Sequence, residues 1–364
     1  MVHLHGAATM TSRSRVRGAA LQASLLTNSN TNMDPPPPNP LNLLSEDQLA
    51  EKVDMLLDWW HDKKQVLCIT GAGLSTESGL ADYRGHNGSY HRGHKPMIHD
   101  QFMGSEYQRK RYWGRGMVGW TNFFTAKPNK GHLALASLER NKKIGVTFDD
   151  QPEFYNSEQD DSWLFSSGQQ QMAIITQNVD SLHRRAGSTH VTELHGRTDM
   201  LVCMSCGAKR ERNDFHTELE TSNREWLERA MNEAEMRPDG DAALPDDNNS
   251  YYKSLCIPPC QSCGEGFLKP SVVFFGDSVP SHRRARCSAA VDAADGLLVV
   301  GSSLAVYSSY RHVREAHQKG TPIAILNVGE TRAELEQLNS VTKIEAPAGP
   351  TLQRIAQHFD TQNS

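Results

Sequence analysis

Residues 71–79 read Gly71-Ala72-Gly73-Leu74-Ser75-Thr76-Glu77-Ser78-Gly79, directly after the apolar run Val66-Leu67-Cys68-Ile69-Thr70. A buried strand that ends at two close glycines predicts a tight turn whose backbone N–H groups face a phosphate. We expect a helix to follow and to place its positive end at the same point. The dinucleotide fingerprint has a third glycine three places after the second, whereas this chain has Thr76 there. Taken alone, the stretch also fits a strand-to-loop turn that binds nothing.

Three further stretches, 172–176, 296–304 and 322–327, predict buried strands that end in small or polar residues. Helical patterns lie between these stretches. One begins at Ser45, which forms a capping-box pattern with Gln48. Strands that alternate with helices predict an α/β fold with a Rossmann-like, doubly wound parallel sheet. Ligands of such sheets bind at the carboxyl ends of the strands.

Polar side chains follow the strand at 172–176. Gln177, Asn178 and Asp180 come within four positions, and side chains of this kind orient ribose hydroxyls, a carboxamide or a water. A hydrogen-bonded loop without a ligand explains the same residues. His195 precedes a glycine after another strand-like run, and its ordinary pKa near 6.5 suits a general base. The chain has 16 histidines, so a structural role for His195 is an alternative.

Two CxxC pairs, Cys203/Cys206 and Cys260/Cys263, predict a closed tetrahedral zinc site of structural type. Their separation exceeds the usual ~15–20 residues of a zinc ribbon, and we interpret the polar segment between them as an inserted loop. A redox role for one pair is the alternative. Cys256 is a further cysteine that could be the zinc ligand in place of Cys260. The seven cysteines are odd in number and clustered, which argues against a secreted disulfide framework.

The composition argues against several classes of function. The formal net charge of −5 gives no reason to expect direct nucleic-acid binding. No apolar run approaches the ~20 residues that span a bilayer, so we expect no membrane insertion. Residues 86–141 mix aromatic and basic side chains, which is also the pattern of single-strand nucleic-acid binders. We interpret them as a helical lid or subdomain with its charges in solvent.

The first 33 residues contain no Asp or Glu but contain Arg13, Arg15 and Arg17. This composition is typical of a mitochondrial transit peptide, and it predicts a mitochondrial matrix protein. A plain disordered tail is the alternative. The proline-rich residues 34–40 are a stiff linker that precedes the fold.

These signals predict a discontinuous organisation. Residues 1–40 are the transit-like segment and linker. Residues 41–85, 171–200 and 268–360 form the Rossmann-like domain, 86–170 a helical and loop insertion, and 201–267 a small zinc-binding domain. The acidic residues near 142–170 are expected to be disordered or mobile.

A set of motifs covering residues 41–360 resembles the sirtuin family of NAD-dependent protein deacylases. In chain order they are GAGLSTESGLADYR, TQNVDSLH, ELHG, the two CxxC pairs, KPSVVFFGD, GSSL and ILNVGETR. The forms STESGLADYR, VVFFGDSV and GSSLAVYSSYR resemble the class II branch. That branch includes mitochondrial sirtuins of the lipoamidase and ADP-ribosyltransferase type.

The resemblance implies roles for individual residues. His195 is the expected catalytic base, with Asn178 holding the ribose or a water. The floor of the acyl-lysine cleft is expected at residues 274–277. The cofactors are NAD and one structural Zn²⁺ held by Cys203, Cys206, Cys260 and Cys263. The expected NAD contacts are Gly71, Ala72, Gly73, Ser75, Glu77, Asp82, Tyr83, Arg84, Gln177, Asn178, Val179, Asp180, Gly301, Ser302, Ser303, Asn327, Val328, Gly329 and Thr342.

The implied substrates are proteins or peptides that carry acyl-lysine, with lipoyl, biotinyl or other acyl groups, acetyl among them. The implied products are nicotinamide and O-acyl-ADP-ribose. Protein mono-ADP-ribosylation from the same NAD site is the alternative activity. Two other classes remain open from the residues alone: an NAD-dependent dehydrogenase, and a zinc-ribbon binding module without activity.

Overall fold

The computed structural model describes residues 44–82, 88, 96–149, 171–236, 242–245 and 250–362, and the structural statements below concern these residues. The predicted transit peptide and linker lie outside them, as do residues 150–170 of the acidic insert. Among the described residues, no helix has the length and apolar character that crossing a membrane requires.

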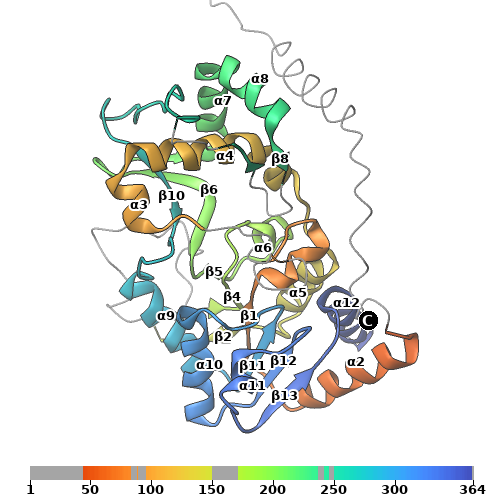
Figure 1. The fold of residues 1–364 in the computed structure, drawn as a ribbon. Helices are drawn as coiled ribbons and strands as arrows, with labels where there is room; N and C mark the ends of the chain where they lie inside the picture. Colours follow the sequence, from red (N-terminus) through yellow and green to blue (C-terminus); the bar gives the residue numbers. More distant parts are fainter. Residues whose placement is uncertain are drawn as a thin grey trace, which may run out of the picture. The chain divides into compact units, whose positions relative to one another are not determined.

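A six-stranded parallel sheet, in the order β13-β12-β11-β1-β4-β5, confirms the predicted doubly wound α/β fold (Figure 1). Its strands are β1 (Val66–Thr70), β4 (Ile174–Thr176), β5 (Val191–Glu193), β11 (Gly296–Val300), β12 (Ile323–Leu326) and β13 (Val341–Ile344). The sequence analysis did not predict β13. Only Ile344 is buried in this edge strand, so its apolar signal is weak.

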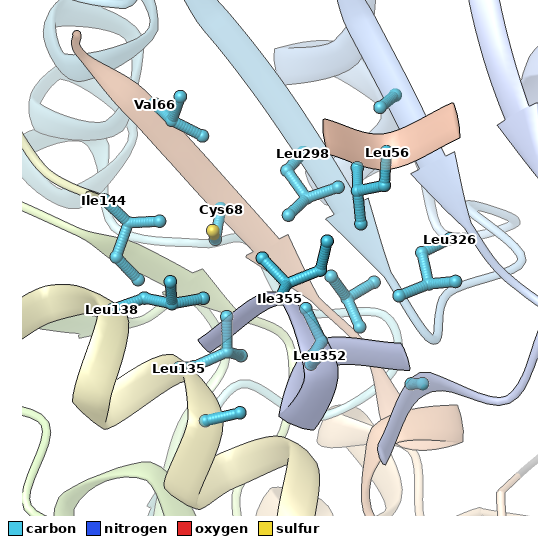
Figure 2. Close-up of a cluster of buried hydrophobic side chains, with 14 of the residues drawn as sticks. Leu56, Val66, Cys68, Leu135, Leu138, Ile144, Leu298, Leu326, Leu352 and Ile355 are labelled. Carbon is cyan, nitrogen blue, oxygen red and sulfur yellow. The ribbon is translucent and has the colours of Figure 1, made fainter. Parts of the chain in front are cut away.

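Helices cover both faces of the sheet. On one face, α2 (Glu46–Trp60), α5 (Lys130–Arg140) and α12 (Ala348–Gln362) pack in a shared apolar core, in which Leu56, Leu135 and Leu352 are fully buried (Figure 2). On the other face lie α9 (Ser281–Ala293), α10 (Tyr307–Lys319) and the short α11 (Arg332–Leu335). The capping box of Ser45 and Gln48 at the start of α2 is confirmed.

A second sheet is antiparallel and has the order β10-β6-β7. Its strands are β6 (Gly196–Cys203), β7 (Lys209–Glu211) and β10 (Leu268–Val272). It shares an apolar cluster with α3 (His99–Gly104), α4 (Glu106–Thr125), α7 (Arg212–Ser222) and α8 (Arg224–Glu233). Two ribbons pair β2 (Val146–Thr147) with β3 (Gln171–Met172), and β8 (Glu235–Met236) with β9 (Ala242–Ala243).

The predicted insertion 86–170 is therefore not one packing unit. Residues of α3 and α4, such as Phe102 and Trp113, pack in the cluster of the small sheet. Those of α5, Leu135 and Leu138, pack against the parallel sheet instead. Helix α5 is amphipathic and its apolar face points to the larger core, which its position in the sequence did not reveal.

The glycine turn itself differs from the expectation in one respect. Two 3₁₀ turns, η2 (Ala72–Leu74) and η3 (Thr76–Ser78), follow β1 in place of an α-helix. The Thr76 hydroxyl donates to the Gly73 carbonyl, and Gly79 ends the second turn with φ +84°. The segment after β1 therefore consists of single 3₁₀ turns. It does not supply the dipole of a long helix to the site. The short helix α6 (Leu182–Arg185) follows β4.

Candidate active site

The glycine turn packs directly on the end of the neighbouring strand β11. The Gly71 N–H donates to the Val300 carbonyl, and the Gly73 N–H donates to the Gly301 carbonyl at 2.9 Å. A Cβ atom on Gly73 would lie 2.8 Å from the Gly301 oxygen. Gly301 has φ +58°, where side chains are strained. Two backbones thus approach at the carboxyl edge of the sheet, where α/β proteins bind their ligands.

The Ser75 hydroxyl connects this turn to the segment after β4. It donates to Asp180 Oδ2 at 2.7 Å and accepts from Asn178 Nδ2 at 3.0 Å. Asn178 Nδ2 also donates to the Gly71 carbonyl at 3.1 Å. Burial raises the pKa of Asp180, while the hydrogen bonds from the Leu182 N–H and Ser75 lower it. The structure therefore brings four predicted site residues into one polar network.

Two buried histidines lie beneath this network, and the sequence analysis did not single them out. His132 Nε2 lies 3.5 Å from Ser75 Oγ, and His183 Nε2 lies 2.8 Å from Thr70 Oγ1. Their rings stand edge to face with centroids 5.0 Å apart. Burial lowers the pKa of His132 to about 4, and it lowers the pKa of His183 well below its ordinary value. Both rings are therefore neutral at pH 7.

Gln177 connects the cofactor residues with the expected base. Its Nε2 donates to Ser302 Oγ at 2.7 Å, and its Oε1 accepts from Ser309 Oγ at 2.9 Å. Its main-chain carbonyl accepts from His195 Nδ1 at 3.0 Å. Gln177 thus ties the end of β11 and the first turn of α10 to the His195 ring.

The His195 ring has a hydrogen-bond partner at each nitrogen. Nδ1 faces the Gln177 carbonyl, and Nε2 lies 2.8 Å from Ser308 Oγ. Burial lowers the pKa of His195 to about 4, helped by the nearby positive charge of Arg283, while the bond to Gln177 opposes the shift. The ring is therefore neutral at pH 7, as a general base must be before it takes up a proton.

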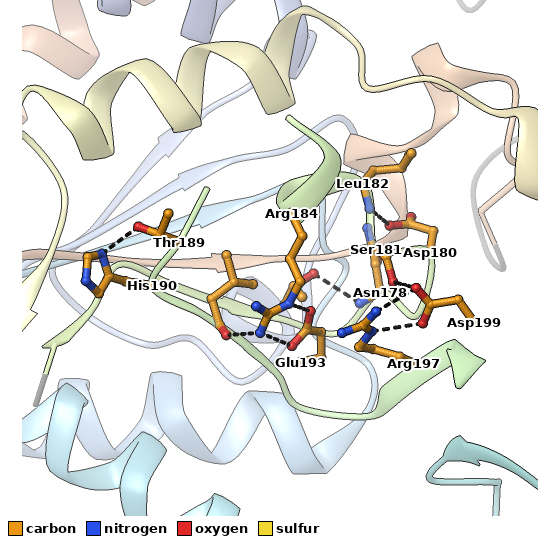
Figure 3. A network of polar contacts seen from close by, with 12 residues as sticks. Asn178, Asp180, Ser181, Leu182, Arg184, Thr189, His190, Glu193, Arg197 and Asp199 are labelled. Atoms are coloured by element: carbon orange, nitrogen blue, oxygen red, sulfur yellow. Dashed lines mark hydrogen bonds and ion pairs between the residues drawn. The ribbon is translucent and has the colours of Figure 1, made fainter. Parts of the chain in front are cut away.

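Ion pairs fix the backbone around these residues (Figure 3). Arg184 of α6 donates to both carboxylate oxygens of Glu193, which is buried at the end of β5. Arg197 holds Asp199 through two bonds of 2.8 and 2.7 Å, and Asp199 also accepts from Ser181 Oγ. Ser181 has φ +60° directly beside Asp180. These pairs hold a strained turn at the place where Asp180 leaves the sheet.

Two of the remaining predicted NAD contacts have other partners or positions. Glu77 accepts from the Gly349 N–H at 3.0 Å, so its carboxylate caps the start of α12. Thr342 lies inside β13 opposite Ala324, two residues before the carboxyl end of that strand. Their roles toward NAD stay predictions.

The other predicted contacts that the structure describes follow strand ends or belong to the glycine turn. Asn327 follows β12 and donates to the carbonyls of Val328 and Gly329. The Ser303 carbonyl, past the end of β11, accepts from the Arg332 N–H. Ala72 lies in the glycine turn, Val179 follows β4, and Asp82 follows η3. Tyr83 and Arg84 lie outside the described residues.

The predicted floor of the acyl-lysine cleft runs beside His195. The Val273 N–H donates to the His195 carbonyl at 2.9 Å, so the residue just before the predicted segment 274–277 lies next to the expected base. His99 joins this segment to α3, because its N–H donates to the Phe275 carbonyl and its Nδ1 lies 3.1 Å from Asp277 Oδ2.

The four predicted cysteine ligands come together although their two pairs are far apart in sequence. Their sulfur atoms lie within 4.8 Å of one another, and Cys203–Cys263 and Cys206–Cys260 are 3.7 and 3.8 Å apart. Zn–S bonds of about 2.3 Å in a tetrahedron place sulfurs roughly 3.8 Å apart. The cluster fits a structural zinc site and uses Cys260, so the alternative ligand Cys256 is not needed.

The parallel sheet, the glycine turn at its carboxyl edge and the four-cysteine cluster define an α/β protein with a candidate ligand-binding edge and a candidate structural metal site. The Sir2 family matches residues 71–149 and 162–308. The chain belongs to the Sir2 family, the NAD-dependent protein deacylases.

Relatives from bacteria and animals support this membership. An NAD-dependent protein deacetylase 2 from Bradyrhizobium diazoefficiens is 41% identical over 279 residues, which are 77% of this chain and 89% of that protein. The NAD-dependent protein deacylase Sirt4 of Drosophila melanogaster is 40% identical over 321 residues, 88% of this chain and 89% of that one.

Solved structures agree with the sequence comparison. One solved structure comes from work on the structural basis for the mechanism and regulation of Sir2 enzymes. It has a TM-score of 0.59 and 26% identity, and the match covers 87% of this chain and 100% of that one. A Sir2 homologue in complex with NAD has a TM-score of 0.58 and 25% identity, with 85% and 95% covered.

Proposed function

We propose that this protein removes acyl groups from lysine side chains of proteins and consumes NAD, with nicotinamide and O-acyl-ADP-ribose as products. The observation that carries the proposal is the meeting of the glycine turn, Asn178, Asp180 and the neutral His195 at one edge of the sheet. Family membership supports it further. A dehydrogenase would share the sheet and could also use a histidine base, so family membership is what favours the deacylase.

The residues present fit NAD. Gly71 and Gly73 present backbone without side chains, although their N–H groups are bonded to the Val300 and Gly301 carbonyls. Gln177 and Asn178 offer amides, and Asp180 offers a carboxylate. When bound, NAD supplies an activated ribose carbon and nicotinamide as a leaving group. The glycine turn would hold the pyrophosphate, Asp180 would accept from the carboxamide, and Asn178 would orient the ribose or a water.

His195 acts after nicotinamide has left. Its Nδ1–H is held by the Gln177 carbonyl, which leaves the lone pair of Nε2 as the proton acceptor. With NAD bound, His195 would take a proton from a ribose hydroxyl at this nitrogen, which would make the ribose oxygen a nucleophile. The backbone bond from Val273 to the His195 carbonyl supports the proposal that the acyl-lysine segment 274–277 begins beside this base.

We further propose a class II enzyme of the mitochondrial matrix that prefers lipoyl, biotinyl or other extended acyl groups to acetyl. The motifs STESGLADYR, VVFFGDSV and GSSLAVYSSYR support the branch, and the Drosophila relative matches 88% of the chain. The acid-free, arginine-bearing residues 1–33 support the location. Fusing residues 1–40 to a reporter tests the location: import and cleavage support it, and a cytosolic reporter contradicts it.

The deciding experiment measures nicotinamide release from NAD by the zinc-loaded full chain. The protein is incubated with acetyl-, lipoyl- and biotinyl-lysine peptides and without peptide, and deacylated peptide is measured in parallel. Release that depends on one acyl group supports a deacylase of that specificity. Release with ADP-ribose attached to protein and no deacylated peptide favours ADP-ribosyl transfer instead. No release with any peptide rejects the proposed activity.

A further inference from the structure

The hydrogen bonds of His195 fix which of its nitrogens carries the proton. The Gln177 carbonyl only accepts hydrogen bonds, so His195 Nδ1 must donate across the 3.0 Å between them. In the neutral ring Nε2 is then bare. The Ser308 hydroxyl, 2.8 Å away, donates to it. The lone pair that the proposed reaction uses is thus occupied by a serine that the sequence analysis did not single out.

Ser308 reaches the ring from a well-anchored position. It is the second residue of α10, a 13-residue helix, and its neighbour Ser309 is fully buried and bonds to the Gln177 side chain at 2.9 Å. Two adjacent hydroxyls therefore attach the first turn of α10 to both sides of the base. Ser308 is partly exposed, whereas the helix that carries it is held by the buried Tyr310 and Val313.

A hydroxyl suits both protonation states of the ring. It donates to bare Nε2, and after a rotation about its C–O bond it accepts from Nε2–H. The second bond involves a charged donor and is the stronger of the two. Ser308 therefore favours the protonated ring and opposes burial, which lowers the pKa of His195 to about 4.

The charged groups around the ring do not supply this support. Arg283 of α9 donates to the Leu194 carbonyl and disfavours a second positive charge at His195. Glu193, at the end of β5, is engaged by Arg184 of α6. A neutral partner at Nε2 therefore adds to the support that the Gln177 carbonyl gives the imidazolium at Nδ1.

We propose that Ser308 is a positioning residue for His195: its hydroxyl holds the ring by donating to Nε2 in the ligand-free protein, gives up that lone pair to the ribose hydroxyl, and accepts the Nε2–H once the base is protonated. In that step the O–H bond of a ribose hydroxyl breaks, an N–H bond forms at Nε2, and the electron pair stays on the ribose oxygen. The inference rests on the proposed function, because it assigns a partner to the base of that reaction.

Two substitutions of equal shape isolate the hydroxyl. Ser308→Thr keeps it, and Ser308→Val replaces it by a methyl group of similar size. We expect Ser308→Thr to stay within about threefold of wild type in deacylation, and Ser308→Val to lose about tenfold or more, the effect of one hydrogen bond to a charged group. The KM for NAD should be the same in both.

Two further readouts separate positioning from a general structural effect. Exchange of labelled nicotinamide into NAD precedes the base step, so Ser308→Val should keep that exchange while product formation falls. By NMR titration of the ligand-free protein, the pKa of His195 should be lower in Ser308→Val than in Ser308→Thr. Equal deacylation and equal His195 titration in the two variants would overturn the inference.

Ser288→Ala is the matched control. Ser288 is a partly buried helical serine with one side-chain bond, to Glu315 on α10 at 3.0 Å, and it belongs to no part of the proposed site. Its deacylation should equal that of wild type. If wild type itself consumes no NAD with any acyl peptide, the proposed function fails. If wild type is active and both Ser308 variants match it, only the present inference fails.

Discussion

The Ser75 hydroxyl donates to the carboxylate of Asp180 across 2.7 Å, although 105 positions separate them in sequence. The same hydroxyl accepts from Asn178 and faces His132. A serine hydroxyl has one donor and two acceptor positions, and here all are used. Ser75 therefore holds the glycine turn and the segment after β4 at a fixed separation.

Replacing Ser75 by Ala should lower kcat/KM for NAD at least about tenfold, because Asp180 and Asn178 each lose a bond worth roughly 1–3 kcal/mol. Steady-state kinetics at varied NAD measures this. Ser137→Ala is the control, since Ser137 bonds only at the surface, to Asp360 and Asn141. Equal kcat/KM in the two variants would contradict the importance of the Ser75 bonds.

His195→Tyr should abolish NAD-dependent deacylation and leave the fold intact. A positioned general base contributes on the order of 10²–10⁴-fold, and the phenol cannot accept a proton at pH 7. Product formation is measured by chromatography, with circular dichroism and thermal melting to check folding. His358→Tyr, at an exposed position of α12, should behave like wild type. Near-native turnover of the His195 variant would show that another group is the base.

Acid should destabilise the protein through its buried histidines. An unfolded chain binds a proton at His132 near the ordinary pKa of 6.5, whereas burial lowers the pKa of His132 to about 4 in the folded protein. Between these values the unfolded state binds more protons, so stability is full above pH 6.5 and falls as the pH falls toward 4.

For His132 alone this amounts to about 2 kcal/mol at pH 5, and His183 shifts in the same direction. Urea unfolding at pH 7.5 and 5.0 measures the loss. His132→Gln should show a smaller difference between the two pH values, whereas the exposed His358→Gln should match wild type. An unchanged difference in His132→Gln would exclude His132 as the source.

Zinc should be required for the small sheet. Cys206→Ser removes one of four ligands, so the zinc content should drop from about one ion per chain to well below one, with a lower melting temperature. Elemental analysis of the purified protein measures the metal. Cys256→Ser is the control and should keep its zinc, because Cys256 is not in the sulfur cluster. Loss of zinc from the Cys256 variant would mean that the ligand set is wrong.

Gly73→Ala should destabilise the protein by about 1–3 kcal/mol and weaken NAD binding, because the new methyl group meets the Gly301 carbonyl at 2.8 Å. Denaturant unfolding and NAD titration test both effects. In Gly104→Ala the methyl group has no neighbour within 4 Å, so stability should change by no more than about 0.5 kcal/mol. Similar stability of the two variants would show that the turn can move away from Gly301.

Local patterns in the sequence determined the elements and the fold class. The buried runs around β1, β4, β11 and β12 were predictable because a strand covered on both faces is apolar throughout. The capping box at Ser45 is a four-residue signal, and the CxxC pairs carry the chemistry of their metal. Strand β13 was not predicted because it is only partly buried. The helix expected after the glycine turn is absent because Gly79 ends the second 3₁₀ turn.

The tertiary structure alone decided which side chains meet at the carboxyl edge. Strand order places β1 between β11 and β4, so the ends of three distant segments converge beside Gly71. The contacts of Ser308 with His195 and of Glu77 with Gly349 follow from that convergence. A hydrogen bond acts over about 3 Å, and residues more than a hundred positions apart carry no local pattern that foretells it. Sequence thus determined the elements and the chemistry available, and topology decided the partners.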